Sequence, residues 1–304
     1  MNPSSPNQGS PSLGSRNPGC LTPGRLNPGR LNPGGATVAL VGPGRVGTAL
    51  AIGLVAAGHE VTAVAGRAPD APGVLVLAAR FGARPSSVGE VARDADLVIL
   101  ATPDAAIGDA AAAVTAGLRG DALVLHCSGS IGLEVLAPIA ATRPEVRLGV
   151  LHPLQTIPSG DVGEARLAGA WAAVTGPPEV AALAEQLGMH PFTVADEHRD
   201  RYHAAACIAS NHLVALLGQV ERVGADAGVP FAAFEPLVRA TIDNVFALGP
   251  EAALTGPISR GDVLTVARHL AAVAADEQQA YRALAATASK LAGRDDDAMR
   301  DVLG

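Results

Sequence analysis

Short hydrophobic runs alternate with helix-length segments along the first two thirds of the chain. Six such runs occur between residues 38 and 175, and each is only four to six residues long. Strands buried on both faces of a parallel sheet have this composition, because helices cover both sides of such a sheet. The pattern predicts strands at residues 38–41, 61–65, 97–101, 123–126, 146–151 and 171–175.

Beyond Ala195 the strand-like runs stop and longer helical patterns follow. Helices are expected to begin near Glu197, near Ala232 and at Gly261–Asp262. In the last of these, apolar residues recur at helical spacing, and Asp262 stands where an N-cap or first-turn acid belongs. The predicted fold is therefore α/β, a doubly wound parallel sheet at residues 36–196, followed by an all-helical domain at residues 197–304.

Residues 1–35 have a different composition. They hold seven prolines, seven glycines, three arginines and no acidic residue, so they have little with which to build a core and are expected to form a disordered tail. An interaction tail is the alternative interpretation.

The whole chain has a net charge of -7, which gives no reason to expect a nucleic-acid surface. Three scattered cysteines indicate neither a metal site nor a disulfide framework. No apolar run suits a membrane span or a signal peptide, so a cytoplasmic protein without membrane contact is expected.

A glycine-rich motif follows directly after the first predicted strand. Gly42-Pro-Gly44-Arg45-Val46-Gly47 leads into a helical segment and then into the second strand. In this strand–turn–helix order, the GxGxxG pattern indicates the dinucleotide site of a Rossmann fold. Gly42 allows the tight turn, Gly44 lets the backbone approach a pyrophosphate, and Gly47 lets helix and strand pack closely.

The end of the second strand selects between the two nicotinamide dinucleotides. NAD enzymes place Asp or Glu there, about 20 residues beyond the motif, to bind the ribose 2′-hydroxyl. This chain has Ala65-Gly66-Arg67 instead, and an arginine can bind a 2′-phosphate. NADP is therefore the expected cofactor, although Arg67 as a solvated loop charge is an alternative.

Polar residues follow the other strand ends at the same sheet edge. Thr102 and Pro103 are expected to line the nicotinamide ribose, whereas Asp104 and Asp109 are interpreted as helix caps. Ser128 is assigned to the cofactor and Ser130 to the substrate, with capping of a helix at residues 131–141 as the alternative. Beyond the next strand, His152 is a candidate general acid or a structural histidine, and Gln155 a candidate substrate ligand.

The first helix of the second domain carries a polar stripe. At α-helical spacing, His203, Cys207, Ser210 and Asn211 share one face, which suggests a cleft. We assign His203 and Asn211 to catalysis and Ser210 to substrate binding. Arg260, in a Gly- and Pro-containing turn, is a candidate clamp for a substrate carboxylate, and a salt bridge with Asp262 is its alternative.

Together these motifs resemble the 6-phosphogluconate dehydrogenase-like superfamily. The nearest resemblance is to Rossmann-like oxidoreductases with a C-terminal domain of unknown function (domain of unknown function 2520), over about residues 36–292. It rests on the glycine motif and on four further segments, His126-Cys-Ser-Gly-Ser130, His152-Pro-Leu-Gln155, Ser210-Asn211 and Leu254-Thr-Gly-Pro257 with Arg260-Gly-Asp262. The resemblance implies NADP binding and a helical domain that forms a homodimer and closes the active site.

One position departs from the hydroxyacid dehydrogenases of this superfamily. Their first helix after the nucleotide domain presents a catalytic lysine and, four residues later, an asparagine. Asn211 matches the asparagine, but Cys207 occupies the lysine position, and Lys290 is the only lysine in the sequence. The lysine mechanism therefore does not carry over.

The leading hypothesis is an NADP-dependent oxidoreductase acting on CH–OH or CH–NH groups of a small carboxylated carbonyl or imine substrate, with ketopantoate reduction as the specific guess. The alternative is a catalytically inactive NADP-binding sensor or scaffold, suggested by the missing lysine. Substrate identity, reaction direction and proton donor are not determined by the sequence.

Overall fold

The computed structural model describes residues 35–157, 166–294 and 297–304. The tail expected at residues 1–35 therefore lies almost entirely outside the described residues. The chain divides into two compact units, one ending at Thr193 and one beginning at Val194. Each unit is described separately below.

The first unit is built around an eight-stranded sheet in the order β3-β2-β1-β4-β5-β6-β7-β8. All six predicted runs are strands, which confirms the α/β class. The strands are β1 (Thr37–Val41), β2 (Glu60–Ala65), β3 (Arg84–Ser86), β4 (Leu97–Leu100), β5 (Leu123–His126), β6 (Arg147–Leu154), β7 (Trp171–Thr175) and β8 (His190–Thr193).

The sheet is mostly parallel, and its last two strands reverse direction. Strands β1 to β6 run parallel to their neighbours, whereas β7 is antiparallel to β6 and parallel to β8. The hydrophobic run of β7 does not reveal its direction. Such a run reflects burial on both faces of the sheet, which is the same for parallel and antiparallel strands. The sheet is thus mostly parallel, as expected for a doubly wound fold, and its β7–β8 edge is the exception.

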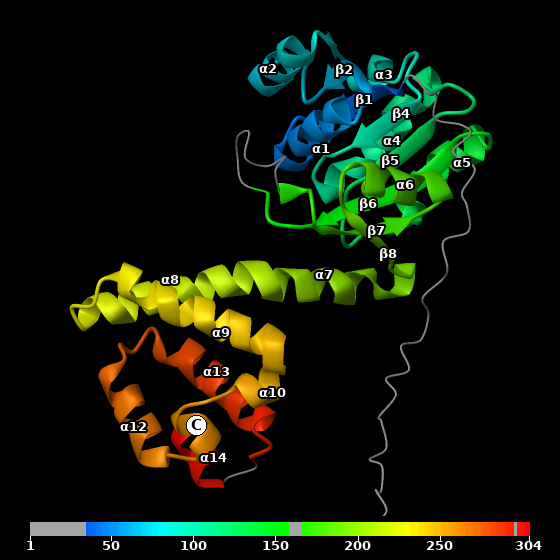
Figure 1. Cartoon of the computed structure of the whole chain (residues 1–304). Coiled ribbons are helices and arrows are strands. Elements are labelled where there is room, and N and C mark those ends of the chain that lie inside the picture. Colours follow the sequence, from blue (N-terminus) through cyan, green and yellow to red (C-terminus); the bar gives the residue numbers. More distant parts are fainter. Residues whose placement is uncertain (1–34, 158–165, 295–296) are drawn as a thin grey trace, which may run out of the picture. The chain divides into compact units, whose positions relative to one another are not determined.

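Helices cover both faces of the sheet (Figure 1). Side chains alternate along each strand, so Val38 and Leu40 join one core while Ala39 and Val41 join the other. The first core includes residues of α1 (Arg45–Ala56), α2 (Pro72–Phe81) and α6 (Pro178–Gln186). The second includes residues of α3 (Val88–Val91), α4 (Ile107–Val114) and α5 (Ala137–Thr142).

Strands β1 and β4 are joined at their N-terminal ends by a carboxylate. Asp96 accepts hydrogen bonds from the Thr37 amide (2.9 Å) and hydroxyl (2.7 Å), and it pairs with Arg119 at 2.9 Å. Partial burial alone would raise the pKa of Asp96, but the bonds from Thr37 and the charge of Arg119 hold it below the ordinary value. The contribution of this carboxylate to folding is therefore present at neutral pH and is lost in strong acid.

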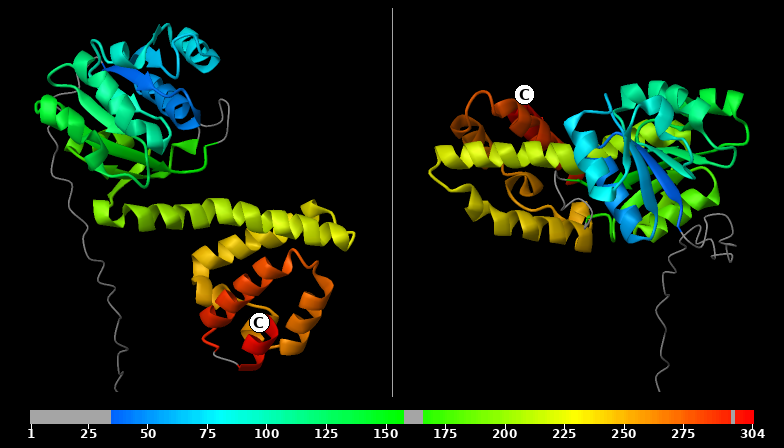
Figure 2. Two further views of the ribbon diagram at one scale, coloured as in Figure 1. Left: turned by 180° about the vertical axis from the view of Figure 1, so that it is seen from behind. Right: turned by 90° about the horizontal axis from the view of Figure 1, so that it is seen from above.

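The second unit is helical, and its longest helix continues through three segments. These are α7 (Arg199–Cys207), a π-helical turn (Ile208–His212) and α8 (Leu213–Asp226), visible as one rod in Figures 1 and 2. The remaining helices are α9 (Glu235–Leu248), α10 (Pro250–Ala253), α11 (Pro257–Arg260), α12 (Val263–Ala272), α13 (Gln278–Leu291) and α14 (Asp297–Leu303).

The core of the second unit is small and lies among α11 to α14. Val266 and Leu270 of α12 pack with Ala285, Met299 and Leu303. Asp262 caps α12 as predicted, because its carboxylate accepts bonds from the Thr265 amide and hydroxyl at 3.0 and 2.7 Å. By contrast, α9 buries no residue and α8 buries only Gly224, so these two helices lie largely outside that core.

We predict that Gly47→Ala destabilises the first unit. A Cβ atom at this position would lie 2.2 Å from the backbone oxygen of Gly42 and 3.1 Å from the Ala101 side chain. Overpacking of this kind costs about 1–3 kcal/mol. Thermal unfolding of the full chain measures the effect. Gly44→Ala is the matched control, because its Cβ would meet nothing within 4 Å, and equal unfolding temperatures for the two variants would refute the prediction.

Candidate active site

The three motif glycines occupy three different environments. Gly42 has a φ of +97°, and a Cβ there would lie 2.5 Å from the carbonyl oxygen of Ala101. Gly47 faces Gly42 and Leu40 so closely that no side chain fits, whereas Gly44 faces open space. Gly42 and Gly47 therefore serve the close packing of β1, α1 and β4, while Gly44 leaves a surface that a ligand can approach.

Free backbone amides point from the start of α1. The first intrahelical bond near this end is donated by the Thr48 amide to the Gly44 oxygen at 2.8 Å, so the amides of Arg45, Val46 and Gly47 precede the helical ladder. No side chain caps this end, and its first turn contains no acidic residue. Arg45 is exposed. Amide donors, the helix dipole and an exposed cation together suit an anion such as a pyrophosphate.

The segment after β2 lies beside the glycine loop. A Cβ on Gly66 would lie 2.8 Å from Val74 of α2 and 3.5 Å from the Pro43 ring. The next residue, Arg67, is exposed and makes no hydrogen bond or ion pair with the part of the chain that the structure describes. Its guanidinium is therefore available to bind a phosphate. Without a ligand, the same side chain would be a solvated loop charge, which is the alternative interpretation.

The end of β4 places a buried hydroxyl without a partner beside the glycine loop. The backbone nitrogen of Thr102 lies 3.0 Å from the position that a Cβ of Gly42 would take. The Thr102 Oγ1 atom is buried and has no hydrogen-bond partner among the described residues. Such groups are uncommon in folded proteins and call for an explanation, and a bound ligand is one. Pro103, the next residue, is exposed.

The loop after β5 is held by its own side chains. His126 is fully buried, and its ring accepts a bond from the Ser128 amide at 3.3 Å and lies 3.1 Å from the Gly132 oxygen. The Ser128 oxygen accepts from the amides of Ser130 (3.2 Å) and Ile131 (3.1 Å). Ser128 is only 6% exposed, so its hydroxyl mainly shapes this turn.

The helix expected at residues 131–141 is shorter. A 3-10 turn at Leu133–Leu136 precedes α5, which begins at Ala137 because Pro138 fits only in the first turn of an α-helix.

Ser130 and Asp104 meet across two strand ends. The Ser130 hydroxyl donates to the Asp104 carboxylate at 2.9 Å, although the two residues are 26 positions apart. Asp104 does not cap α4, and neither does Asp109, which lies inside the first turn of that helix. The interpretation of these acids as caps is therefore wrong. Sequence reasoning missed this pair, although both residues followed predicted parallel strands and so belonged to one sheet edge.

Burial at this edge keeps a cysteine thiol protonated. The Cys127 thiol follows β5 and packs against the first core. Burial raises its pKa to about 12, so the thiol stays protonated at neutral pH.

His152 and Gln155 follow the β5 site along the same edge. His152 lies two residues beyond Val150, which pairs with His126, and it faces Ala173 in the antiparallel pair with β7. Beyond this strand pairing, His152 takes part in at least one other interaction, so it is not without a partner. Gln155 is exposed, and its side-chain oxygen accepts from the Thr156 amide at 2.8 Å, which leaves its amide group as a donor.

In the second unit, the predicted polar stripe runs into the π-helical turn. His203 and Cys207 lie in α7, four residues apart as expected, whereas Ser210 and Asn211 lie in the turn, whose wider winding changes the α-helical spacing. The Ser210 hydroxyl donates to the Ala206 oxygen (2.8 Å) or to the Asn211 side-chain oxygen (2.9 Å). Asn211 is exposed and keeps its amide group as a donor.

Arg260 ends α11 with an exposed side chain. Neither a hydrogen bond nor an ion pair joins its guanidinium to any described residue, so the expected alternative of a salt bridge with Asp262 does not form. The Asp262 carboxylate instead caps α12, and the charge of Arg260 is one of the smaller influences that lower its pKa.

The described residues contain neither a metal-binding cluster nor a membrane-spanning helix. No group of three His, Cys, Asp or Glu side chains is arranged to hold a metal ion. No described helix combines the length and the apolar character that a bilayer crossing requires.

Two family models match the sequence. A Rossmann-like domain matches residues 22–153, and a domain of unknown function (DUF2520) matches residues 168–288. The second match begins before β7, so it includes the reversed strands of the sheet as well as the helical unit as far as Ala288. No curated protein is similar enough in sequence to count as a match.

Three solved structures show how far the likeness extends. A Bacteroides fragilis protein assigned as an NADP oxidoreductase is 25% identical, with a TM-score of 0.72 over 84% of this chain and 98% of its own. A Thermotoga maritima protein is 23% identical, with a TM-score of 0.60 over 88% and 98%. The NADP-bound pyrroline carboxylate reductase of Plasmodium falciparum is 13% identical, with a TM-score of 0.56 over 85% and 96%.

The last two likenesses concern the fold alone. The order of the two matched domains and their joint coverage agree with the resemblance that the sequence motifs suggested. The chain therefore contains a Rossmann-like domain followed by the domain of unknown function DUF2520.

Proposed function

We propose that this protein is an NADP-dependent oxidoreductase that transfers hydride to or from a small carboxylated carbonyl or imine substrate. The observation that carries the proposal is the site at the sheet edge: an open Gly44, together with amides at the start of α1 and an Arg67 side chain that have no partner among the described residues. The likeness to the Bacteroides fragilis protein assigned as an NADP oxidoreductase supports it.

The residues present fit the pyrophosphate, the 2′-phosphate and the nicotinamide side of NADP. Arg45, Val46 and Gly47 would present amides to the pyrophosphate across Gly44, where a side chain would intrude. Arg67 would bind the 2′-phosphate, and no acidic residue in the first turn of α1 opposes a phosphate. The buried Thr102 hydroxyl, beside Pro103, would gain the hydrogen-bond partner that it lacks among the described residues. When bound, NADP supplies or accepts the hydride.

The Ser130–Asp104 pair constrains which groups can lie next to it. Because the Ser130 proton is directed at Asp104, the pair presents oxygen acceptors and negative charge to a ligand. A carboxylate is repelled there, whereas an N–H group of an amide, amine or protonated imine is attracted. This arrangement favours the imine class of substrate. It leaves the substrate carboxylate to Arg260, whose guanidinium has no acidic partner among the described residues.

Proton transfer is assigned to the histidines of the proposed site. With Cys207 at the lysine position of the related dehydrogenases, His203 is the proposed proton donor, Asn211 a hydrogen-bond donor, and His152 the proposed second acid. Ser128 serves the site through the turn that it holds together.

We also propose that the protein is a homodimer. Four large apolar side chains of α8 and α9 are strongly exposed: Val214 (71%), Leu237 (65%), Phe246 (88%) and Leu248 (61%). Helices of this length gain most of their stability from packing, yet α8 and α9 bury almost nothing within the chain. A second copy that covers this α8–α9 surface would supply the packing, and apolar patches of this kind mark interfaces.

Arg67→Ala tests the cofactor assignment. We expect NADPH binding to weaken by about 1.5–3 kcal/mol, the usual contribution of a charge-assisted contact, while NADH binding stays nearly constant. Titration of cofactor fluorescence measures both affinities. Arg93→Ala, which removes an exposed arginine of the same unit, is the control. An equal loss for both cofactors would show that Arg67 does not bind the 2′-phosphate.

Two substitutions in the second unit test the separate roles proposed for Arg260 in substrate binding and for His203 in proton transfer. Arg260→Ala is expected to raise KM for a carboxylated substrate and to leave NADPH binding intact, because its proposed partner is the substrate. His203→Ala is expected to lower kcat by about 100- to 10,000-fold, the usual contribution of a general acid.

The assay follows NADPH consumption with a panel of 2-oxo acids and cyclic imines, and Arg268→Ala is the control for a nearby exposed arginine. NADPH binding without turnover on the whole panel would favour the binding-only alternative.

Phe246→Glu tests the dimer. We expect the variant to be monomeric at micromolar concentration and to unfold at lower temperature, because a charge would be placed in the apolar interface. Light scattering after size-exclusion chromatography measures the mass. Val76→Glu, at a 70% exposed position of α2, should remain a dimer. A monomeric wild-type protein would contradict the proposal.

A further inference from the structure

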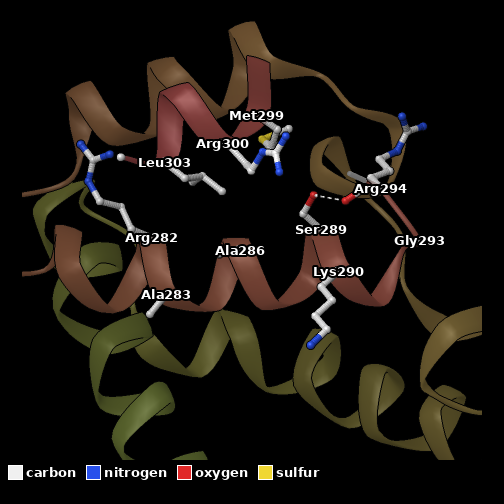
Figure 3. Close-up of a pocket in the computed structure, with 11 residues that line it drawn as sticks. Arg282, Ala283, Ala286, Ser289, Lys290, Gly293, Arg294, Met299, Arg300 and Leu303 are labelled. Atoms are coloured by element: carbon white, nitrogen blue, oxygen red, sulfur yellow. Dashed lines mark hydrogen bonds between the residues drawn. The ribbon is translucent and has the colours of Figure 1, made fainter. Parts of the chain in front are cut away.

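A pocket of about 770 Å³ lies in the second unit, lined by residues of 282–294 and 299–304, none of which is assigned to the proposed cofactor or substrate sites. Four of its lining residues are apolar: Ala283, Ala286, Met299 and Leu303. In Figure 3, Met299 and Leu303 lie between α13 and α14 with arginines around them, whereas Ala283 and Lys290 project from the opposite side of α13. The volume falls in the range of pockets that bind small organic molecules.

The charged side chains that line the pocket are all cationic, and the lining also includes Ser289 and the C-terminal residue Gly304. Arg282, Lys290, Arg294 and Arg300 line the pocket, and no Asp or Glu does. In Figure 3, Arg282 and Arg294 lie toward opposite ends of α13, and Arg300 extends between them from α14. A ligand lying along α13 would therefore have positive charge at both of its ends.

Three of these cations have no carboxylate partner in the described parts of the chain. Arg282 donates to the Val302 oxygen at 2.7 Å and Arg294 to the Ser259 oxygen at 2.7 Å, and Lys290 makes neither a hydrogen bond nor an ion pair. Only Arg300 pairs with an acid, Asp297. Asp295 and Asp296 lie outside the described residues.

Two other arginines of this unit have acidic partners, whereas Arg260, like three of the pocket cations, has none among the described residues. Arg222 pairs with Glu277 and Arg239 with Glu235, in a chain with more acidic than basic residues. The helix dipole accounts for Lys290 and Arg294, which lie at the C-terminal end of α13. Arg282 lies in the N-terminal half of α13 and donates to the Val302 oxygen at the C-terminal end of α14, where positive charge is also favourable.

Backbone contacts hold the cations in place. The Ser289 oxygen accepts from the Arg294 amide at 3.0 Å, and the buried Ser289 hydroxyl donates to the Arg294 oxygen at 3.4 Å. The bond to Ser259 then directs the Arg294 side chain across α11. Guanidinium groups that are already oriented lose less entropy when an anion binds.

We propose that this pocket binds a small amphipathic anion, a carboxylate or phosphate monoester with an apolar body. The apolar lining would contact the body, and Arg282, Lys290 or Arg294 would bind the anionic group. This site does not depend on the proposed oxidoreductase activity, because none of its lining residues belongs to the cofactor or substrate assignment.

Calorimetric titration of the full chain, saturated with NADP, tests the proposal with four probes: octanoate, butanoate, octyl phosphate and octylamine. We expect both C8 anions to bind and octylamine not to bind. Each buried methylene contributes about fourfold in affinity, so butanoate should bind much more weakly than octanoate. Failure of both C8 anions to bind, equal binding of octylamine, or equal affinities of the two carboxylates would overturn it.

Variants then locate the binding. Ala286→Phe fills the apolar floor and should abolish octanoate binding, whereas Thr287→Phe, one residue along α13 and outside the lining, should not. Lys290→Gln with Arg294→Gln should weaken octanoate by about tenfold or more through the lost charge. Circular dichroism confirms that each variant is folded. Octanoate binding that is unchanged in Ala286→Phe would place the anion elsewhere and refute the site.

Discussion

The approach of three backbone segments without intervening side chains determines the geometry of the first unit. Gly42 and Gly47 bring the end of β1 and the start of α1 against Ala101 at the end of β4. A single added methyl group would separate them, because protein interiors have almost no free volume at such contacts. The same approach brings the loop at Gly44 next to Thr102 and to the segment after β2. The candidate cofactor site is thus a consequence of tight packing directly beneath it.

The second unit is built on the opposite principle. Its helices α11 to α14 share a core of only a few residues, and the long α7–α8 rod and α9 contribute little to it. A helix with an exposed apolar face lacks packing on that face. If a second copy covers it, the stability of this unit depends on protein concentration. The first unit, with a core on each face of its sheet, has no such requirement.

The sequence predicted the central strands because they are apolar on both faces, and it predicted the N-cap Asp262 because capping is local. It did not indicate β3 (Arg84–Ser86) or β8 (His190–Thr193), which are short edge strands containing proline and polar residues. The sequence also did not indicate that β7 runs antiparallel to β6, because a strand buried on both faces has the same composition in either direction.

At the candidate site, the residues of the glycine motif were identifiable from their spacing. The Ser130–Asp104 bond was not, because it joins two loops that only the folded sheet brings together.

The π-helical turn at Ile208–His212 has a consequence for how this family can vary. A π turn holds one residue more than the α-helix around it, and one residue corresponds to a rotation of about 100°. Everything beyond the turn, including the apolar face of α8, is therefore rotated relative to α7. A relative that lacked this extra residue could keep every side chain and still present a different face of α8. The length of this one helix, more than its composition, then sets which surface meets a partner.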